Sequence, residues 1–417
     1  MRDMDRREFS RIAMAGMAGL PAAATTYAAK GDASEQAATP SAGSNPLPGH
    51  ARKKVGGLYH RPLGRTGFWI SELSVGGSPS PPLNVFMAAI ERGVNFCDTS
   101  PRYSEGKGEQ LIGQVIRGRR EQVYVSTKIT PGRGGILKTD DAIKQVEGSL
   151  KRLGTDYIDI LCAHGVTSEE QVLADWVLEA IEQLRKAGKA RFFGASVHNT
   201  TAKFNRAYIE SGHYQVMLIP FNMYFDPKMK SGKSASEADS LSNVLALAAE
   251  KGVGVITMKS LAAGSQANVA APAGISPVQA KLRWVLRHPQ VTSILNEMVT
   301  FDYLKEDLAA SAADLSGAEE AYLRRCAGET ADAFCRMCRS CESACPASVP
   351  VPDVLRVRMY ALDYGDRDKA RELAREINLP SLLDNCHRCA KCQAACPWRV
   401  RTSELMDDLR KTTICGV

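Results

Sequence analysis

Three absences narrow the possibilities for this 417-residue chain. Its formal net charge is +7, but its lysines and arginines are scattered among acidic residues and form no long basic block or aromatic-interleaved basic stripe, as nucleic-acid binding would need. No run reaches the roughly 20 strongly apolar residues that a membrane-spanning helix requires. No glycine-rich dinucleotide fingerprint follows an early strand pattern, which disfavours an open doubly wound sheet. We therefore expect a globular protein with a solvated charged surface and no nucleic-acid partner.

Cysteine is also absent from most of the chain. Of the 12 cysteines, Cys97, Cys162, Cys326 and Cys415 stand alone, and the other eight lie in two short clusters. No cysteine precedes Cys97, which argues against a lipid anchor near the N-terminus. Strand alternation turns Cys97 toward outer helices, and Cys162 fits core packing. The sequence gives no role for Cys326 or Cys415, so we expect the cysteine chemistry in the two clusters.

Residues 1–29 carry the pattern of an export signal. The stretch DRREFSR places Arg6 and Arg7 before Phe9, and a mostly apolar run at residues 12–24 follows and ends in small residues. This order resembles a twin-arginine signal, which implies a periplasmic or otherwise exported protein. The apolar run is too short and too rich in alanine to span a bilayer stably, so we expect cleavage and no stable membrane anchor afterwards. The alternative is an accidental arginine pair at the start of a cytoplasmic reductase.

The chain beyond the signal divides into three further parts. Residues 30–54 are rich in alanine, serine, glycine and proline and predict a flexible linker. Residues 55–315 alternate eight β-rich runs with helical patterns, and residues 316–417 contain the cysteine clusters. Eight alternations over about 250 residues indicate a closed (β/α)8 TIM barrel of the α/β class. The runs are residues 69–75, 95–100, 123–128, 157–164, 191–198, 215–222, 252–259 and 291–297.

Four ionisable residues, called the tetrad below, fall at or just after strand ends. Asp98 is near the end of the second run, with Tyr103 five residues on, while Lys128 ends the third run and His164 the fourth. Because the working residues of such a barrel lie where strands end, we expect these four to converge. Taken singly, a capping Asp, a loop Tyr, a surface Lys or a hydrogen-bonded His is more often structural. Together they indicate a catalytic group.

Several segments around these residues resemble the aldo-keto reductase family. They are YHRPLGRTGFWISELSVGG, GVNFCDTSPRYSEGKGEQLIG, VSTKI, SLKRLGTDYIDILCAHGV and GVGVITMKSLAAG, and the resemblance covers roughly residues 58–310. The four residues fall at the positions of that family's catalytic tetrad. The resemblance implies reversible hydride transfer between a nicotinamide cofactor, NAD(P), and a small carbonyl or alcohol substrate, such as a sugar or related polyol.

The roles implied for the tetrad are chemically sensible. As hydride reaches a carbonyl carbon, negative charge develops on oxygen, and Tyr103 would donate a proton there. An unperturbed tyrosine has a pKa of about 10, and the ammonium of Lys128 is expected to lower it. Asp98 would pair with Lys128 and hold it in place, while His164 would hydrogen-bond the carbonyl oxygen and orient it.

The resemblance also implies a set of dinucleotide contacts. In the family, residues after strand five reach the carboxamide, residues on strand six follow, and the strand-seven loop approaches the pyrophosphate. The strand-eight region departs from the family, because Glu297 and the pair Glu306-Asp307 stand where basic and amide residues are common. Acids repel phosphate, which weighs against a preference for NADP, and a structural helix with a lost or rebuilt adenine site is the alternative. The implied contacts are Ser196, His198, Gln215, Asn222, Lys259 and Glu306.

The two cysteine clusters share one spacing. CRMCRSCESACP, residues 335–346, and CHRCAKCQAACP, residues 386–397, both follow C-x2-C-x2-C-x3-C-P, the bacterial ferredoxin run. In that run thiolates hold a 4Fe-4S cluster, and the fourth cysteine usually ligates the other cluster. The expected ligand sets are Cys335, Cys338, Cys341 and Cys396 for one cluster and Cys386, Cys389, Cys392 and Cys345 for the other. Zinc and disulfides are the alternatives, although zinc modules usually present paired knuckles set farther apart.

The sequence between the clusters has a helical pattern, so residues 316–417 resemble a small, mainly α-helical dicluster ferredoxin domain. Two functions follow. The first is an exported oxidoreductase with hydride chemistry at the tetrad and electron transfer through two 4Fe-4S clusters to a redox partner protein. The second is an iron-sulfur electron-transfer protein that uses the barrel as a docking scaffold. A complete tetrad favours the first.

Overall fold

The computed structural model describes residues 51–76, 80–131, 138–226, 241–262 and 269–412, and residues 46–417 form one compact unit. The predicted signal, residues 30–50 of the predicted linker and Cys415 lie outside the described residues. Within the described ranges, no helix is both long and apolar enough to cross a membrane.

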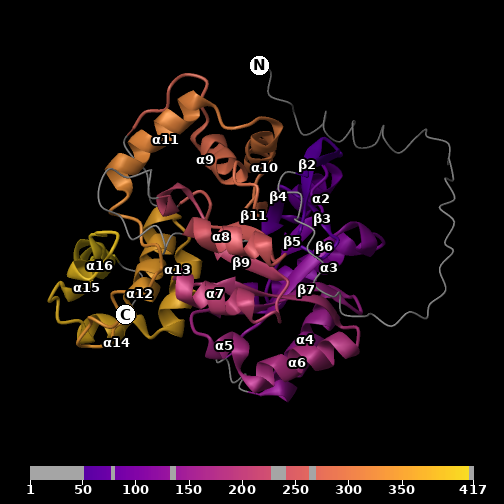
Figure 1. The fold of residues 1–417 in the computed structure, drawn as a ribbon, viewed down its shortest axis with the longest axis horizontal. Coiled ribbons are helices and arrows are strands. Elements are labelled where there is room, and N and C mark those ends of the chain that lie inside the picture. Colours follow the sequence, from indigo (N-terminus) through magenta and orange to yellow (C-terminus); the bar gives the residue numbers. More distant parts are fainter. Residues whose placement is uncertain (1–50, 77–79, 132–137, 227–240, 263–268, 413–417) are drawn as a thin grey trace. The chain divides into compact units, whose positions relative to one another are not determined.

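Eight parallel strands close into a barrel (Figure 1), which confirms the predicted (β/α)8 fold. Around the barrel the strands follow the order β10-β11-β4-β5-β6-β7-β8-β9. Their bounds are β4 Leu73–Gly76, β5 Phe96–Asp98, β6 Tyr124–Ile129, β7 Ile158–Val166, β8 Ala190–Val197, β9 Val216–Pro220, β10 Gly254–Met258 and β11 Val291–Asn296.

Amphipathic helices surround the barrel. In α4, Thr139–Leu153, the buried residues Ala142, Val146 and Leu150 recur every fourth position and face the strands, and the helix ends at Gly154, whose φ of 66° suits glycine. The other helices of this layer are α2 Leu83–Glu91, α3 Lys107–Ile116, α5 Glu170–Leu173, α6 Asp175–Lys186, α7 Ala202–Glu210, α8 Leu241–Glu250, α9 Pro277–Leu286 and α10 Phe301–Ala309.

Strand alternation separates an inner core from an outer one. Phe96 and Cys162 pack inside the barrel, whereas Cys97 packs with the outer core between strands and helices, as the sequence predicted for both cysteines. Asp98 has the parity of Phe96, and Lys128 lies in register with Cys162, so both point into the barrel as well. The fold therefore directs these two tetrad residues inward.

A small antiparallel sheet, β1 Lys53–Val55, β2 Leu58–Pro62 and β3 Trp69–Ser71, precedes the barrel and corrects two boundaries. Its first strand contains the last two residues of the predicted linker. The predicted strand 69–75 is divided at Glu72, since β3 belongs to this sheet and β4 to the barrel. Glu72 is buried and accepts a 2.6 Å hydrogen bond from Arg61 Nε, which fixes the chain at this break.

The C-terminal part is helical, as expected. Helix α11, Gly317–Thr330, starts with a capping box formed by Ser316 and Glu319, and its Cys326 is buried in the outer core of the barrel. A separate apolar core then holds the later helices together. These are α12 Val351–Arg358, the π-helical turn η7 Met359–Asp363, α13 Arg367–Glu376, α14 Leu379–Asn385, α15 Lys391–Ala394 and α16 Thr402–Arg410.

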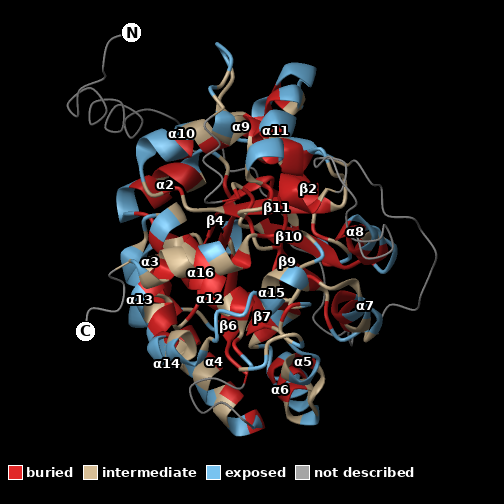
Figure 2. Cartoon of the chain, turned by 90° about the vertical axis from the view of Figure 1, so that its left-hand side faces the viewer, coloured by how far each residue is buried: buried red, intermediate tan, exposed pale blue. Residues whose placement is uncertain are grey.

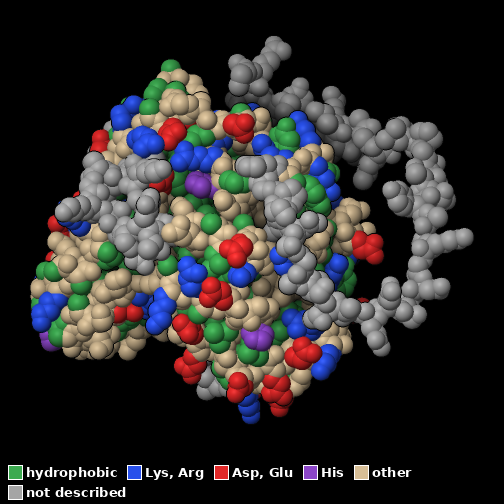
Figure 3. Space-filling view, viewed as in Figure 1, with side chains coloured by type: hydrophobic (Ala, Val, Ile, Leu, Met, Phe, Trp, Pro, Cys, Tyr) green, Lys and Arg blue, Asp and Glu red, His purple; other side chains and the backbone are tan. Residues whose placement is uncertain are grey.

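These helices lie at one end of the barrel. In Figure 1 they are yellow and flank the strands, and Figure 2 looks onto that end, with α12 and α16 in front of β6 and β7. On the face drawn in Figure 3, acidic and basic side chains alternate, as the scattered charge in the sequence predicted.

Candidate active site

A cavity of about 860 Å³ lies at the carboxyl ends of the barrel strands. All four tetrad residues line it, so the structure brings the predicted group together. The opposite side of the cavity comes from the segment between the two cysteine clusters, which the sequence did not place there. We call this side the C-terminal wall; it comprises Arg356, Tyr360, Lys369, Glu372, Leu373 and Glu376.

Lys128 and Asp98 form a buried ion pair in the cavity floor. Lys128 Nζ donates to the Asp98 carboxylate and, at 2.6 Å, to the carbonyl oxygen of Thr99. Burial raises the pKa of Asp98, and the positive charge of Lys128 opposes that shift. Each side chain is at most 3% exposed, so neither charge has solvent to replace its partner.

Tyr103 stands beside this pair on the loop after β5. The next two residues, Ser104 and Glu105, have φ values of 48° and 55°, a strained path that turns the chain into α3. Lys128 Nζ lies 5.1 Å from the centroid of the Tyr103 ring. The sequence predicted that this ammonium lowers the pKa of Tyr103, but burial, followed by the charge of Asp98, raises that pKa well above its usual value. The predicted lowering of this pKa is therefore contradicted.

His164 completes the tetrad from β7. Its ring stands at 86° to that of Tyr103, with centroids 5.6 Å apart, and its Nδ1 lies 3.1 Å from Ser100 Oγ. Ser100 Oγ already accepts the backbone N–H of Arg102 at 3.2 Å, so its own hydroxyl hydrogen is available to Nδ1. This arrangement favours the tautomer with the proton on Nε2. Ser100 was missed from the sequence, although its place two residues after a strand end was a usable signal.

Four of the six predicted dinucleotide contacts line the cavity: Ser196, His198, Lys259 and Glu306. His198 Nδ1 lies 2.6 Å from Arg356 Nη1, so the C-terminal wall meets a residue expected at the carboxamide. Lys259 has a φ of 55°, and burial and the charge of Arg356 lower its pKa to about 7. Glu306 accepts a 2.7 Å hydrogen bond from Ser276 Oγ.

The acidic groups near the predicted adenine end carry less charge than the sequence suggested. Burial raises the pKa of Glu297 to about 8 and that of Asp307 to about 7. Asp307 also accepts a 2.7 Å hydrogen bond from Asn296 Nδ2. At neutral pH, Glu297 is mostly protonated, which weakens the expected repulsion of a phosphate group.

The other two predicted contacts, Gln215 and Asn222, do not line the cavity. Gln215 precedes β9 at its amino end, where its Oε1 accepts the Phe193 N–H at 3.2 Å, and Leu218 is the β9 residue that lines the cavity. Asn222 is buried away from the cavity; its Nδ2 donates to the carbonyl oxygen of Lys259 at 3.0 Å. Asn222 therefore helps to fix the backbone of Lys259, which does line the cavity.

Cysteines of the two runs lie in or against the apolar core of the C-terminal helices. Cys345, Cys386, Cys389 and Cys392 line one cavity of about 60 Å³. Burial raises the pKa of the Cys335 thiol, and the charges of Cys338, Cys341 and Cys396 raise it further, which makes these four neighbours.

Both cysteine runs also have the same local backbone. Positive φ values occur at the same positions, in Met337 and Arg388 and again in Arg339 and Ala390. The fourth cysteine of each run accepts a backbone N–H from four residues on: Cys345 Sγ from Val349 and Cys396 Sγ from Val400, each at 3.4 Å. N–H donors aimed at sulfur stabilise thiolates, so the geometry fits a thiolate-bound group.

Among the described residues, no three Cys, His, Asp or Glu side chains are grouped as ligands of one metal ion. The described cysteines are also free of disulfides.

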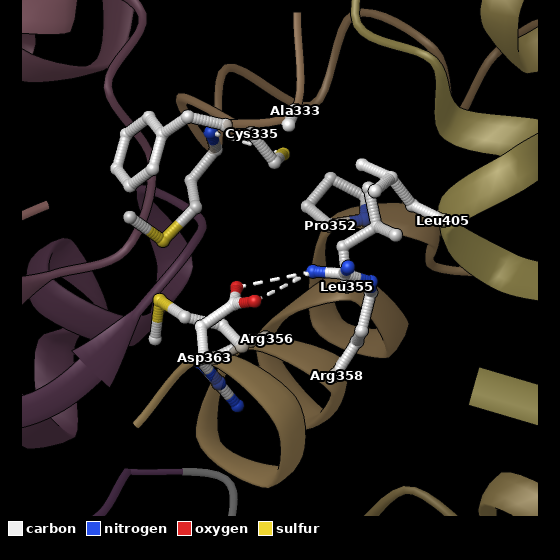
Figure 4. A pocket seen from close by; sticks show the side chains of 11 residues that line it. Ala333, Cys335, Pro352, Leu355, Arg356, Arg358, Asp363 and Leu405 are labelled. Carbon is white, nitrogen blue, oxygen red and sulfur yellow. Dashed lines mark hydrogen bonds and ion pairs between the residues drawn. The ribbon is translucent and has the colours of Figure 1, made fainter. Parts of the chain in front are cut away.

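A small pocket connects the two regions of the molecule. It lies beside Cys335, and Arg356 and Asp363 line both this pocket and the large cavity. Figure 4 shows Asp363 facing Arg358, which donates to its two carboxylate oxygens at 2.9 and 3.1 Å. Arg356 and Asp363 are thus shared by the cavity and by the pocket beside Cys335.

The family comparison agrees with the barrel geometry. A family model described as "Aldo/keto reductase family" matches residues 78–269, a range that contains the whole tetrad. This chain is an aldo-keto reductase-like oxidoreductase. It is 27% identical over 287 residues to the uncharacterized oxidoreductase YqkF of Bacillus subtilis, covering 61% of this chain and 91% of that protein. It is 26% identical over 321 residues to the NADH-specific methylglyoxal reductase of Escherichia coli, covering 64% and 97%.

Solved structures show the same fold. The aldo-keto reductase AKR11C1 from Bacillus halodurans, in its holo form, superposes with a TM-score of 0.51 at 22% identity over 64% of this chain and 96% of its own. The thermostable aldo-keto reductase Tm1743 gives 0.51 at 26% identity over 64% and 99%. An aldo-keto reductase from Klebsiella pneumoniae in complex with NADP and acetate gives 0.50 at 23% identity over 63% and 93%.

Proposed function

We propose that this reductase-like protein transfers hydride between a nicotinamide dinucleotide and a small carbonyl or hydroxyl compound. The observation that carries this is the convergence of the tetrad in a cavity large enough for a small ligand and a cofactor. The Klebsiella pneumoniae relative, whose structure holds NADP, and the methylglyoxal reductase relatives support the cofactor and substrate classes.

The tetrad divides the chemistry as follows. The substrate oxygen lies between the Tyr103 hydroxyl and the Nε2–H of His164, which orient it. Tyr103 donates its proton as negative charge develops on that oxygen, and the Lys128 ammonium stabilises the phenolate that results. Asp98 holds Lys128 in place. When bound, the dinucleotide supplies or accepts the hydride.

Four residues would hold the dinucleotide. Ser196 and His198, at and just after the end of β8, suit the polar nicotinamide amide, and Lys259, which also lines the cavity, suits the pyrophosphate. Glu306 would face the adenosine end. Since Glu297 beside them is mostly protonated at neutral pH, NAD and NADP are both compatible with this end of the site.

We also propose two 4Fe-4S clusters in the crossed cysteine sets, where they would supply one-electron transfer to a redox partner protein. The duplicated backbone and the paired N–H···S bonds support this. The twin-arginine pattern at Arg6 and Arg7 supports export, since that route carries proteins already folded around their cofactors. The alternative, an electron-transfer protein that uses the barrel only for docking, leaves the complete tetrad without a purpose.

Comparison of two variants tests these functions. Tyr103→Phe keeps the ring but removes the proton donor, so carbonyl reduction should slow by about 10²-fold or more. Cys338→Ser should instead abolish dye-linked electron transfer. Anaerobically purified protein should contain about eight iron atoms per chain, together with sulfide. Full activity of Tyr103→Phe in every assay would refute the hydride mechanism, and stoichiometric zinc without iron would refute the clusters.

A further inference from the structure

The loop after β8, which begins at His198, is held from two sides. On the barrel side, the His198 backbone N–H donates to the carbonyl oxygen of Val166 at 2.8 Å. On the other side, Thr200 Oγ1 donates to the carbonyl oxygen of Arg336 at 2.6 Å, and the Thr200 N–H donates to that of Met337 at 3.3 Å. Arg336 and Met337 belong to the first cysteine run. The loop therefore joins the barrel to that run.

Arg356, on α12, makes a second connection to this loop. Its side chain is only 4% exposed and lines the large cavity, and its Nη1 lies 2.6 Å from His198 Nδ1. One turn earlier on α12, Asp353 lies 3.4 Å from Arg356 Nη2 and also accepts a 2.9 Å hydrogen bond from Arg339 Nη2. Since Arg339 belongs to the first cysteine run, a chain of polar contacts leads from that run to the His198 ring.

The chemistry of the contact with Arg356 determines which nitrogen of His198 carries hydrogen. A guanidinium has N–H donors and no acceptor, so Arg356 donates and His198 Nδ1 accepts. Nδ1 therefore carries no hydrogen, and the neutral ring carries its single hydrogen on Nε2. The other tautomer would set two N–H groups against each other at a buried position, where a lost hydrogen bond is costly. Arg356 thus makes His198 an N–H donor through Nε2.

An N–H donor at this place suits a carboxamide. Ser196 and His198 both line the cavity at the end of β8. A carboxamide presents a carbonyl oxygen, which needs a donor, and an amino group, which needs an acceptor. The Nε2–H of His198 can serve the oxygen, and the Ser196 hydroxyl can serve either group. Without Arg356, the ring hydrogen could move to Nδ1 and leave the oxygen without this donor.

We propose that Arg356 is a positioning residue for the dinucleotide, which it serves by holding His198 as an N–H donor for the nicotinamide carboxamide. This inference rests on the proposed hydride function and adds to it a residue from outside the barrel. The C-terminal helices then have a task besides holding the cysteine runs, because one of them completes the nicotinamide end of the site.

The test measures dinucleotide affinity without turnover, by isothermal titration calorimetry of the anaerobically purified full-length chain with NADH and with NADPH. Arg356→Met removes the donor and should raise the Kd of the tighter-binding dinucleotide by about tenfold, the scale of one hydrogen bond to a charged group. Arg356→Lys keeps a charged donor and should retain most of the affinity. His198→Leu removes the same contact from the barrel side and should also raise the Kd by about tenfold.

The double variant Arg356→Met, His198→Leu separates positioning from other effects. If Arg356 acts through His198, the double variant should bind about tenfold more weakly than the wild type, whereas independent effects would multiply to about a hundredfold. Arg358→Met is the matched control, since Arg358 lies on the same helix and lines the pocket beside Cys335 but not the cavity. Its Kd should stay within about twofold of the wild-type value.

Nitrogen NMR of the wild-type protein with 15N-labelled histidine, assigned by His198→Leu, should show the ring hydrogen of His198 on Nε2. A hydrogen on Nδ1 would overturn the proposal even if Arg356→Met fails to fold. Multiplying losses in the double variant, or a wild-type Kd in Arg356→Met, would overturn it as well. In those cases the hydride function stands if the wild type binds dinucleotide and Tyr103→Phe slows reduction. Absence of NADH and NADPH binding in the wild type would overturn both.

Discussion

At the scale of single residues, the Asp98–Lys128 pair is the contact on which the site most depends. Both side chains are buried, and Lys128 has two described acceptors, the Asp98 carboxylate and the Thr99 carbonyl oxygen. A buried ion pair costs desolvation when it forms, so its presence is better explained by the charge that it delivers to Tyr103 than by stability.

Lys128→Met should abolish the activity and lower the stability of the protein. It deprives the Tyr103 phenolate of its ammonium and leaves Asp98 as a buried group without its partner, so the free energy of unfolding should fall by about 3 kcal/mol or more. The double variant Asp98→Asn, Lys128→Met should recover part of that stability, because no unpaired carboxylate remains. It should recover no activity, because the ammonium is still missing. Denaturant unfolding monitored by circular dichroism measures the stability of both variants, and a carbonyl reduction assay measures their activity. Wild-type stability in Lys128→Met would contradict the assignment.

Residue positions were predictable where strand ends decide them. Asp98, Lys128 and His164 stand at the carboxyl ends of clear β-rich runs, and the barrel places such ends together. Gln215 lies outside the cavity because β9 begins at Val216, so Gln215 stands before the amino end of the strand, whereas Leu218 lines the cavity. The pKa of Tyr103 was also beyond sequence reasoning, since it depends on how deeply the fold encloses the ring.

At the scale of elements, Arg336 joins the first cysteine cluster to the barrel. Its guanidinium is buried and donates to the carbonyl oxygens of Tyr224 at 3.1 Å, Ala331 at 2.6 Å and Phe334 at 2.8 Å. It also lies 4.7 Å from the ring centroid of Trp398, which follows the second cysteine run. One side chain of the first run thus contacts the loop after β9 and the residue that follows the second run.

Arg336→Met should loosen this junction. Three buried carbonyl oxygens would lose a donor, at about 1 kcal/mol or more each, so unfolding should become easier by about 3 kcal/mol. His387 follows the first cysteine of the second run, as Arg336 follows that of the first, but it is exposed. His387→Gln is therefore the control and should change stability by less than about 0.5 kcal/mol. Equal thermal melts for the two variants would show that Arg336 does not hold the junction.

Element predictions succeeded where one segment contains its own signal and failed where distant segments decide. The spacing of Ala142, Val146 and Leu150 is enough to predict α4. The break at Glu72 depends on Arg61 and on a second sheet, neither of which the run 69–75 reveals. The pattern of α13 predicted a helix, but its place over Tyr103 comes from packing between residues more than 260 apart, such as Arg102 and Glu376.

At the scale of the whole molecule, the active site and the cysteine clusters share one folding unit. The cavity has walls from both ends of residues 46–417, so it is complete only when the C-terminal helices are in place. Under the proposed twin-arginine routing, the chain would fold and take up the proposed iron-sulfur clusters before export.

A fusion tests that route. Residues 1–50 joined to a reporter that is active only outside the cytoplasm should give signal through the twin-arginine pathway. Arg6→Lys with Arg7→Lys should abolish the signal, because the adjacent arginines are the feature that this pathway recognises. Equal reporter activity in the double variant would contradict the proposed routing.

The central claim is that the barrel transfers hydride directly, with Tyr103 handling the proton. The most direct measurement uses an alcohol substrate deuterated at the reacting carbon, incubated with the wild-type protein and NAD(P), and follows deuterium by mass spectrometry. Direct transfer predicts that the amount of deuterated dinucleotide equals the amount of carbonyl product formed. With Tyr103→Phe, little of either the carbonyl product or the deuterated dinucleotide should form. Release of the deuterium to water, with electrons recovered only through the clusters, would contradict the account.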